Sequence, residues 1–304
     1  MMGGAAPQGL LDITIRGWFW KAAEPLNLEA VDIGYLTQKH KGKFGTIPSL
    51  DESLQDCVLK GKRTVALDGS LRAVIALGYG KTARIRPLLI DLVYELDKRF
   101  PVPLPVLQAR LLDLLPCSDQ TRDLLNSMVR FGALNVTYFE DTPPQLRLTE
   151  IKNRCWAILN DPDRKDSCEK ASAPVTSRCG RVQMATMSQG VLGAKGGVCT
   201  TFAATAVDLL LNDAARKRAC RIEFVSGPKH CLCLLNREIS AKDTHHDTYD
   251  VLVRFQEWNE DVVIIDPWAG AMGYHVISTI ETYPACLKSM IGLGLKKFYD
   301  SEWG

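Results

Sequence analysis

A thiol, an imidazole and a carboxylate stand in three short segments late in the chain. Cys199 lies in GGVCTTFA, His230 in PKHCLC and Asp266 in VVIIDPWAG. A cysteine becomes a strong nucleophile as a thiolate, which requires a nearby base and a favourable local field. The base in turn requires a third group that holds its ring in the correct tautomer. The three residues therefore predict a Cys–His–Asp site for nucleophilic catalysis.

Each of these residues stands where a predicted element begins or ends. Cys199 follows a Gly-Gly-Val turn and precedes a predicted helix over 200–219. Unpaired N–H groups in the first turn of that helix would favour the thiolate and stabilise an oxyanion beside it. His230 opens a predicted strand, and Asp266 ends the apolar strand VVII before a proline. We expect Trp268 to shield the His–Asp hydrogen bond from water.

The order of the elements predicts an α+β fold. After the helix at 200–219 come four strand-like runs, RIEFVSG, HCLCLLNR, YDVLVRFQEW and DVVIIDP. One helix followed by consecutive strands is typical of a helix packed on an antiparallel sheet. The C-terminal part of the chain is therefore expected to place the candidate site between one helix and one sheet.

The N-terminal part is expected to be mainly helical. Apolar residues recur at helical spacing in three segments between Ile85 and Gly132, with Ser118 as an N-cap and Gly132 as a stop. The polar segment 161–180 is typical of an exposed linker. We therefore predict a helical domain of unknown role over 1–165 and a catalytic domain over 166–304.

Composition excludes several function classes. The 304 residues carry a net charge of +2, and 46% are apolar, which indicates an ordinary globular protein without broad attraction to nucleic acid. No apolar run is long enough to span a membrane, and no secretory signal is evident. The ten scattered cysteines are typical of reduced thiols in a cytosol.

No metal or cofactor is expected. The chain has no CxxC pair, and His230, Cys231 and Cys233 would alternate between the two faces of a strand instead of converging on one ion. The remaining close pair of histidines, His245 and His246, stands in a polar loop and is expected to be solvated.

Over residues 185–275 the chain resembles the transglutaminase-like branch of the papain-like cysteine-peptidase superfamily. The matching residues are Gly197-Val198-Cys199 at the start of the helix, His230 at the start of a strand and Asp266 at the end of a later strand. The resemblance implies a papain-like core, with Cys199 as nucleophile, His230 as general base and then acid, and Asp266 orienting the imidazole. In papain an upstream glutamine completes the oxyanion hole, and Gln189 lies ten residues before the cysteine.

The resemblance also implies an activity. It predicts thiolate attack on an amide bond of a protein substrate, an acyl-enzyme, and release by water, as in a cysteine peptidase or a glutamine deamidase. Bacterial effectors that cleave or deamidate host proteins have similar cores. A host protein is therefore one expected partner, and the expected location is the cytoplasm or a host cytosol reached without a signal peptide.

Three alternatives remain open. Transglutaminase-type transfer to an amine would use the same three residues, and a non-catalytic papain-like module would bind a partner protein. The string AKGGVCTT also resembles the phosphate loop of ParA and MinD-type ATPases, and VVIID resembles their magnesium-binding strand. In that reading Cys199 replaces the last loop glycine and Thr200 the phosphate-binding lysine, which removes the chemistry of the loop.

Overall fold

The computed structural model of the protein describes residues 90, 94, 104–112, 114–115, 117–136, 148–175, 178–215, 220–238, 258–259, 261–292 and 295–303. The chain divides into two compact units, residues 1–102 and 103–304. In the first unit, Ile90 and Tyr94 are helical, as predicted for that segment. His245, His246 and most of the predicted strand at 249–258 lie outside the described residues.

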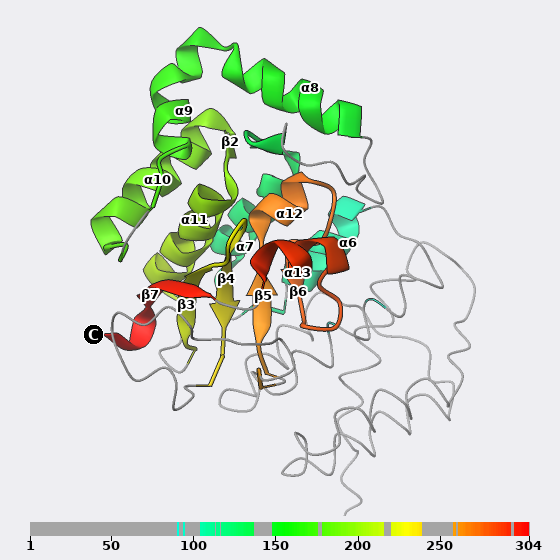
Figure 1. The fold of residues 1–304 in the computed structure, drawn as a ribbon, viewed down its shortest axis with the longest axis vertical. Coiled ribbons are helices and arrows are strands. Elements are labelled where there is room, and N and C mark those ends of the chain that lie inside the picture. The colour runs from blue at the N-terminus through cyan, green and yellow to red at the C-terminus, as the bar shows by residue number, and fades with distance from the viewer. Residues whose placement is uncertain are drawn as a thin grey trace, which may run out of the picture. The chain divides into compact units, whose positions relative to one another are not determined.

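The second unit contains an antiparallel five-stranded sheet in the order β6-β5-β4-β3-β7 (Figure 1). Its strands are β3 (Ile222–Ser226), β4 (Cys231–Leu235), β5 (Val263–Ile265), β6 (Ile277–Ser278) and β7 (Lys296–Asp300). Strands β3, β4 and β5 arise from three of the predicted apolar runs. The combination of helices with an antiparallel sheet agrees with the predicted α+β class.

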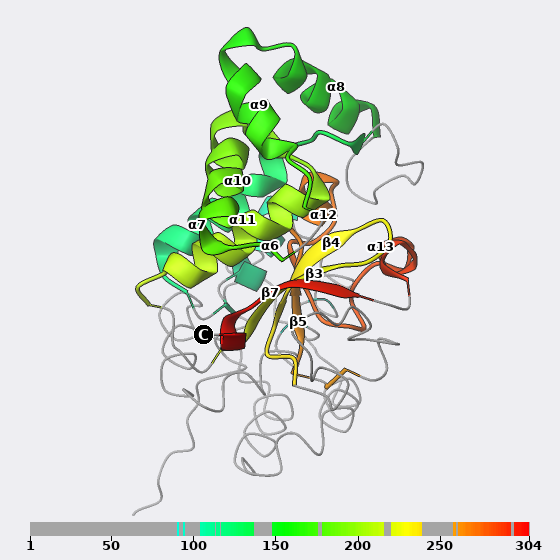
Figure 2. The same cartoon turned by 60° about the vertical axis from the view of Figure 1, so that its left-hand side comes forward.

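Helices pack beside this sheet (Figure 2). The α-helices are α6 (Leu104–Leu112), α7 (Asp119–Ser127), α8 (Leu148–Leu159), α9 (Lys165–Ala171), α10 (Arg181–Ala194), α11 (Cys199–Asn212), α12 (Pro267–Ala271) and α13 (Ala285–Ile291). Short 3-10 turns are η1 (Met128–Arg130), η3 (Pro162–Arg164) and η6 (Ser301–Trp303). Among the described residues, no helix has both the length and the apolar character needed to cross a bilayer.

Helix α11 is the central helix of the unit. Its residues from Phe202 to Val207 are fully or almost fully buried, and it packs on β3 and β4 on one side and on α10 on the other. Four of the five residues from 203 to 207 are alanine or threonine and the fifth is valine, so the helix can approach the sheet closely. The helix ends at Asn212, and residues 216–219 of the predicted helix lie outside the described residues.

Residues 162–171 of the segment 161–180 are helical, which corrects the prediction of a linker there. They form η3 and α9, and α9 packs against α10. A Cβ atom on Gly190 of α10 would lie 2.7 Å from the amide nitrogen of Ala171, so the absence of a side chain permits this contact. The polar composition of the segment reflects a helix with one narrow buried side, because only Ala171 within α9 is buried.

The division at 102/103 also differs from the predicted domain boundary at 165/166. Two short strands explain why residues 119–136 belong with the C-terminal part: β1 (Gly132–Ala133) pairs in parallel with β2 (Gly196–Gly197). Ser118 caps α7 as predicted, with its hydroxyl accepting a hydrogen bond from the Thr121 amide at 3.3 Å. Gly132 does not stop a helix but enters β1.

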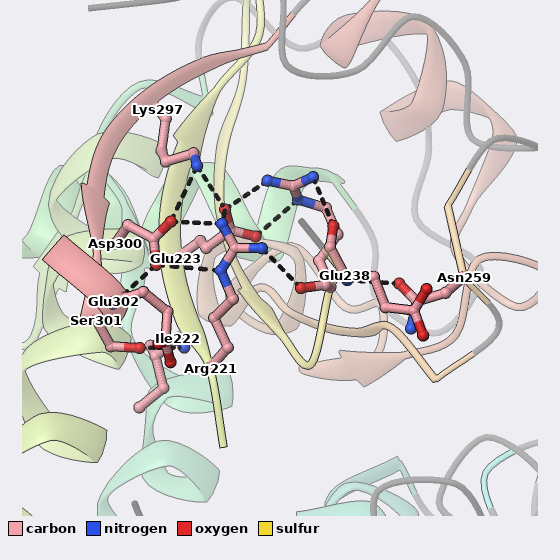
Figure 3. A network of polar contacts seen from close by, with 10 residues as sticks. Arg221, Ile222, Glu223, Glu238, Asn259, Lys297, Asp300, Ser301 and Glu302 are labelled. Carbon is pink, nitrogen blue, oxygen red and sulfur yellow. Dashed lines mark hydrogen bonds and ion pairs between the residues drawn. The ribbon is translucent and has the colours of Figure 1, made fainter. Parts of the chain in front are cut away.

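A buried cluster of charged side chains links the last strand, β7, to the neighbouring strand β3 (Figure 3). We call the set Arg221, Glu223, Arg237, Lys297 and Asp300 the charged cluster. Glu223 of β3 is the register partner of Asp300 of β7, an arrangement that is unfavourable for two carboxylates alone. Arg237 binds Glu223 at 2.6 and 2.7 Å, and Arg221 binds Asp300 at 2.5 and 3.1 Å. Lys297 lies 3.3 Å from Glu223 and 2.9 Å from Asp300, so cations separate the two acids.

Candidate active site

The turn before Cys199 is held by hydrogen bonds on both sides. On one side, β1 supports the glycines: the amide of Leu134 donates to the carbonyl of Gly197 at 2.8 Å. On the other side, the hydroxyl of Thr201 donates to the carbonyl of Ala171 at 2.5 Å and accepts from the Val198 amide at 3.1 Å. Cys199 is thereby fixed as the first residue of α11, at the positive end of the helix dipole.

Glycine is required at the point where the two short strands meet. A Cβ atom on Gly196 would lie 2.8 Å from the carbonyl oxygen of Gly132, which is backbone and cannot rotate away. A Cβ atom on Gly197 would lie 2.8 Å from the hydroxyl of Thr201. The Gly-Gly pair in the sequence therefore serves close backbone packing beside Cys199.

His230 is placed by a tight hairpin between β3 and β4. Ser226 pairs with Cys231, and the Gly227 amide donates to the His230 carbonyl at 2.7 Å. His230 thus stands in the turn, one residue before β4 begins. Its ring is buried, and its Nε2 lies 2.6 Å from Oδ2 of Asp266. Since an ionised carboxylate only accepts hydrogen bonds, Nε2 carries the proton.

Asp266 has two functions at the end of β5. Its Oδ1 accepts from the Ala269 amide at 2.9 Å and so caps α12. Its Oδ2 accepts from His230 and also from the hydroxyl of Tyr283, again at 2.6 Å. A carboxylate that is 1% exposed requires such partners to offset the loss of water. Tyr283 is a member of the site that the sequence did not indicate.

Trp268 covers the imidazole as expected. Its ring centroid lies 5.1 Å from that of His230, and the side chain is 1% exposed. The indole N–H donates to Oδ1 of Asn135 at 2.7 Å, which fixes the orientation of the indole. Asn135 comes two residues after β1, so the pair of β1 and β2 that supports the turn before Cys199 also positions the indole of Trp268.

The thiol of Cys199 meets the imidazole on the side away from Asp266. The side chains of Cys199 and His230 interact, and Nδ1 is the ring nitrogen that the bond to Asp266 leaves for the thiol. Nδ1 makes no hydrogen bond of regular geometry, so this contact is looser than the one to Asp266. The arrangement is the order thiol, imidazole, carboxylate that a general base requires.

Burial and the carboxylate act in opposite directions on His230. Burial lowers the pKa of the imidazole, but the charge and hydrogen bond of Asp266, with smaller contributions from Cys199, raise the pKa to about 10. The ring is therefore positively charged at neutral pH, and a positive charge beside a thiol favours the thiolate.

A second thiol lies at the same place. The thiol of Cys231, the first residue of β4, interacts with that of Cys199. Its sulfur is 3.3 Å from the hydroxyl of Thr200 and 3.2 Å from that of Ser226. The contact with Cys231, together with burial, raises the pKa of Cys199 against the opposing effect of His230. The same contact and the two hydroxyls lower the pKa of Cys231 to about 7.

These shifts describe one coupled pair of thiols. Two adjacent sulfurs cannot both ionise easily, so the pair loses its first proton readily and retains the second. Only Cys199 of the two contacts the imidazole. Strand alternation alone would separate Cys231 from His230, but His230 lies in the hairpin turn, and both residues reach Cys199.

Other candidate residues lie elsewhere. Gln189 is exposed on α10 and is not held near the buried thiol by any contact that the structure shows. Within the described part of the chain, no group of three or more histidine, cysteine, aspartate or glutamate residues has an arrangement that could hold a metal ion. Comparisons with models of protein families, with curated proteins and with solved structures each found no match.

Proposed function

We propose that the protein is a cysteine-dependent hydrolase that cleaves amide bonds of protein substrates through an acyl-enzyme. One observation carries the proposal: the buried imidazole of His230 lies between the carboxylate of Asp266, at 2.6 Å, and the thiol of Cys199 at the start of a helix. A base with this raised pKa, held by a carboxylate against a cysteine, is the arrangement that nucleophilic thiol chemistry requires.

In the proposed reaction, the sulfur of Cys199 attacks the carbonyl carbon of the substrate amide. His230 holds the thiol proton on Nδ1 and delivers it to the leaving nitrogen, which leaves an acyl group on the sulfur. A water molecule then gives a proton to the same nitrogen and attacks the thioester, releasing the acid and the free thiol. Asp266 keeps Nε2 protonated throughout, so that Nδ1 remains the atom that exchanges protons.

The helix N-terminus supplies electrostatic stabilisation for both steps. The N–H groups of Cys199 and of the next residues have no helical partner in the first turn, and the Thr201 hydroxyl caps the helix by accepting from the Val198 amide. A tetrahedral oxyanion next to the sulfur would accept hydrogen bonds from these groups. A helix that begins with cysteine and packs on an antiparallel sheet also supports the resemblance to the papain-like and transglutaminase-like core.

The nucleotide-binding alternative receives little support from the same geometry. The loop before α11 follows a two-residue strand that pairs only with β1 among the described residues, and the main sheet is antiparallel. Phosphate-loop proteins place the loop after a strand of a parallel sheet and use a lysine where this chain has Thr200. Transfer to an amine and non-catalytic partner binding use the same site, and experiment separates them.

Alkylation of the thiols tests the proposal. Iodoacetamide near neutral pH should modify the coupled thiols Cys199 and Cys231 before the other described cysteines, as measured by mass spectrometry of tryptic peptides. His230→Ala should slow this modification by about tenfold or more, because the thiolate loses its positive neighbour. Cys231→Ala is the matched control: it removes the contact that raises the pKa of Cys199, so Cys199 should stay reactive or become more reactive.

A substrate assay then identifies the reaction. Unfolded and native proteins, host proteins among them, are incubated with the enzyme and analysed by intact-mass spectrometry. Cleavage divides a substrate chain, deamidation replaces an amide nitrogen by oxygen, and amine transfer joins two molecules. Cys199→Ala should abolish every such change, with an unfolding free energy within about 1–2 kcal/mol of the wild type. Undiminished activity in this variant would refute the proposed function.

A further inference from the structure

Two reduced thiols from different elements meet in the candidate site. Cys199 begins α11 and Cys231 begins β4, and the packing of this helix on this strand places the two thiols close enough to interact. The neighbour of Cys199 confirms the proximity, since the hydroxyl of Thr200 is 3.3 Å from the sulfur of Cys231. Both cysteines are buried, at 8% and 5% exposure, and both are free thiols.

We propose that Cys231 is a resolving cysteine, which closes a reversible disulfide with Cys199 when a peroxide oxidises the site. The bond itself is independent of catalysis. Its consequence, reversible inactivation of the nucleophile, rests on the proposed function.

The chemistry requires one peroxide and two thiols. The thiolate of Cys199 attacks a peroxide oxygen, which gives a sulfenic acid and releases hydroxide, or an alkoxide from an organic peroxide. The sulfur of Cys231 then attacks the sulfur of Cys199, and the hydroxyl of the sulfenic acid leaves as water with a proton from the site. In sum, hydrogen peroxide and two thiols give one disulfide and two waters. The two cysteine sulfurs are oxidised and the peroxide oxygens are reduced.

The surroundings of Cys231 suit it to the second step. The hydroxyls of Ser226 and Thr200 stabilise a negative charge on its sulfur, and the pKa of this thiol is lowered to about 7. A resolving thiol with a pKa near ambient pH combines ionisation with nucleophilicity. Closing the bond also requires the two Cα atoms to come within about 7 Å.

Cys233 provides an internal comparison on the same strand. It is fully buried, and burial, with the nearby Cys220 and Glu223, raises its pKa well above the usual value, so its thiol stays protonated. It lies two residues further along β4, about 7 Å from Cys231 in the strand direction. Cys233 should therefore not replace Cys231 as the partner of Cys199.

Peptide mapping of the full-length protein tests the proposal. The protein is treated with hydrogen peroxide, free thiols are blocked with N-ethylmaleimide, and tryptic peptides are analysed without reduction. Cys199 lies in peptide 196–216, and Cys231 and Cys233 share peptide 230–237. The wild type should give these two peptides linked, with a loss of two hydrogen atoms, and dithiothreitol should separate them. The variants Cys231→Ser and Cys233→Ser assign the linked residue.

The outcomes distinguish the proposal from its alternatives. Cys233→Ser should form the link as the wild type does. Cys231→Ser should reduce the yield of the linked peptide by about tenfold or more and direct Cys199 to sulfinic acid, because no thiol then captures the sulfenic acid. Absence of the link in the wild type, or its persistence in Cys231→Ser, would overturn the proposal. An active enzyme without the link refutes the switch alone, and a linked protein that never acts on a substrate refutes the proposed function alone.

Discussion

The charge of Asp266 controls the protonation of His230, and Asp266→Asn tests this dependence directly. The pKa of the buried imidazole is about 10, compared with 6.5 for an unperturbed histidine. Burial lowers this pKa, so the raised value depends mainly on the carboxylate. Without the negative charge, the pKa of His230 should fall to 6.5 or below. A fall of the pKa from about 10 to 6.5 corresponds to roughly 5 kcal/mol of imidazolium stabilisation.

Nuclear magnetic resonance of protein labelled with ¹⁵N-histidine measures this pKa. The chain has five histidines, and the signals of His230 are those missing from the variant His230→Ala. A titration from about pH 5 to pH 11 should show that the wild-type ring stays protonated beyond neutrality and that the ring in Asp266→Asn does not. Asp208→Asn is the matched control, because it removes a different buried carboxylate, nine residues after Cys199 in α11.

The same substitution should change the pH dependence of stability. Because folding raises the pKa of His230, the pair stabilises the folded protein fully below about pH 6.5 and loses this contribution as the pH rises through about 10. The difference in urea-derived unfolding free energy between wild type and Asp266→Asn should therefore be larger at pH 6 than at pH 10. A wild-type His230 that titrates near 6.5, or an unchanged pKa in Asp266→Asn, would refute the reasoning.

Three other substitutions test the supports of the site. Gly196→Ala forces a Cβ against the carbonyl of Gly132 and should cost about 1–3 kcal/mol of unfolding free energy, with loss of Cys199 alkylation. Gly180 has open space around it, so Gly180→Ala should keep the alkylation and change the unfolding free energy by less than about 1 kcal/mol. Glu223→Gln leaves three cations of the charged cluster with one acid and should cost about 3–5 kcal/mol in urea unfolding; a neutral result would contradict the importance of the cluster. Tyr283→Phe removes a donor from the buried carboxylate and should cost about 1–3 kcal/mol, and equal stability to the wild type would show that the hydroxyl contributes nothing.

The sequence predicted the parts of the fold that repeat a pattern. The start of α11 and the strands β3, β4 and β5 were identified because their apolar residues are contiguous or periodic over several positions. Strands β1 and β2 are two residues each, GA and GG, and carry no such pattern. They were missed, and with them the pairing that brings residues 119–136 into the same unit as the site. The helix α9 was read as a linker because its buried side is a single alanine.

At the candidate site, the sequence indicated the positions but not the complete set of contacts. Asp266 illustrates why one residue can fit two readings: a turn-forming aspartate before proline and a carboxylate that orients His230 are both observed, one on each oxygen. Tyr283 reaches Asp266 from 17 residues further along the chain, with no motif to connect them. Cys231 was assigned to the opposite face from His230 because strand alternation was extended into a residue that lies in the hairpin turn.

His230 and Asp266 flank the ends of two neighbouring strands, β4 and β5, which pair from Cys233 with Ile265 to Leu235 with Val263. The spacing between imidazole and carboxylate is therefore a property of the main-chain ladder more than of any one side chain. Apolar residues in the surrounding layers could be exchanged for others of similar volume and the spacing would persist. A register shift of one residue between these two strands would instead move the carboxylate to the other face of the sheet and separate it from the imidazole.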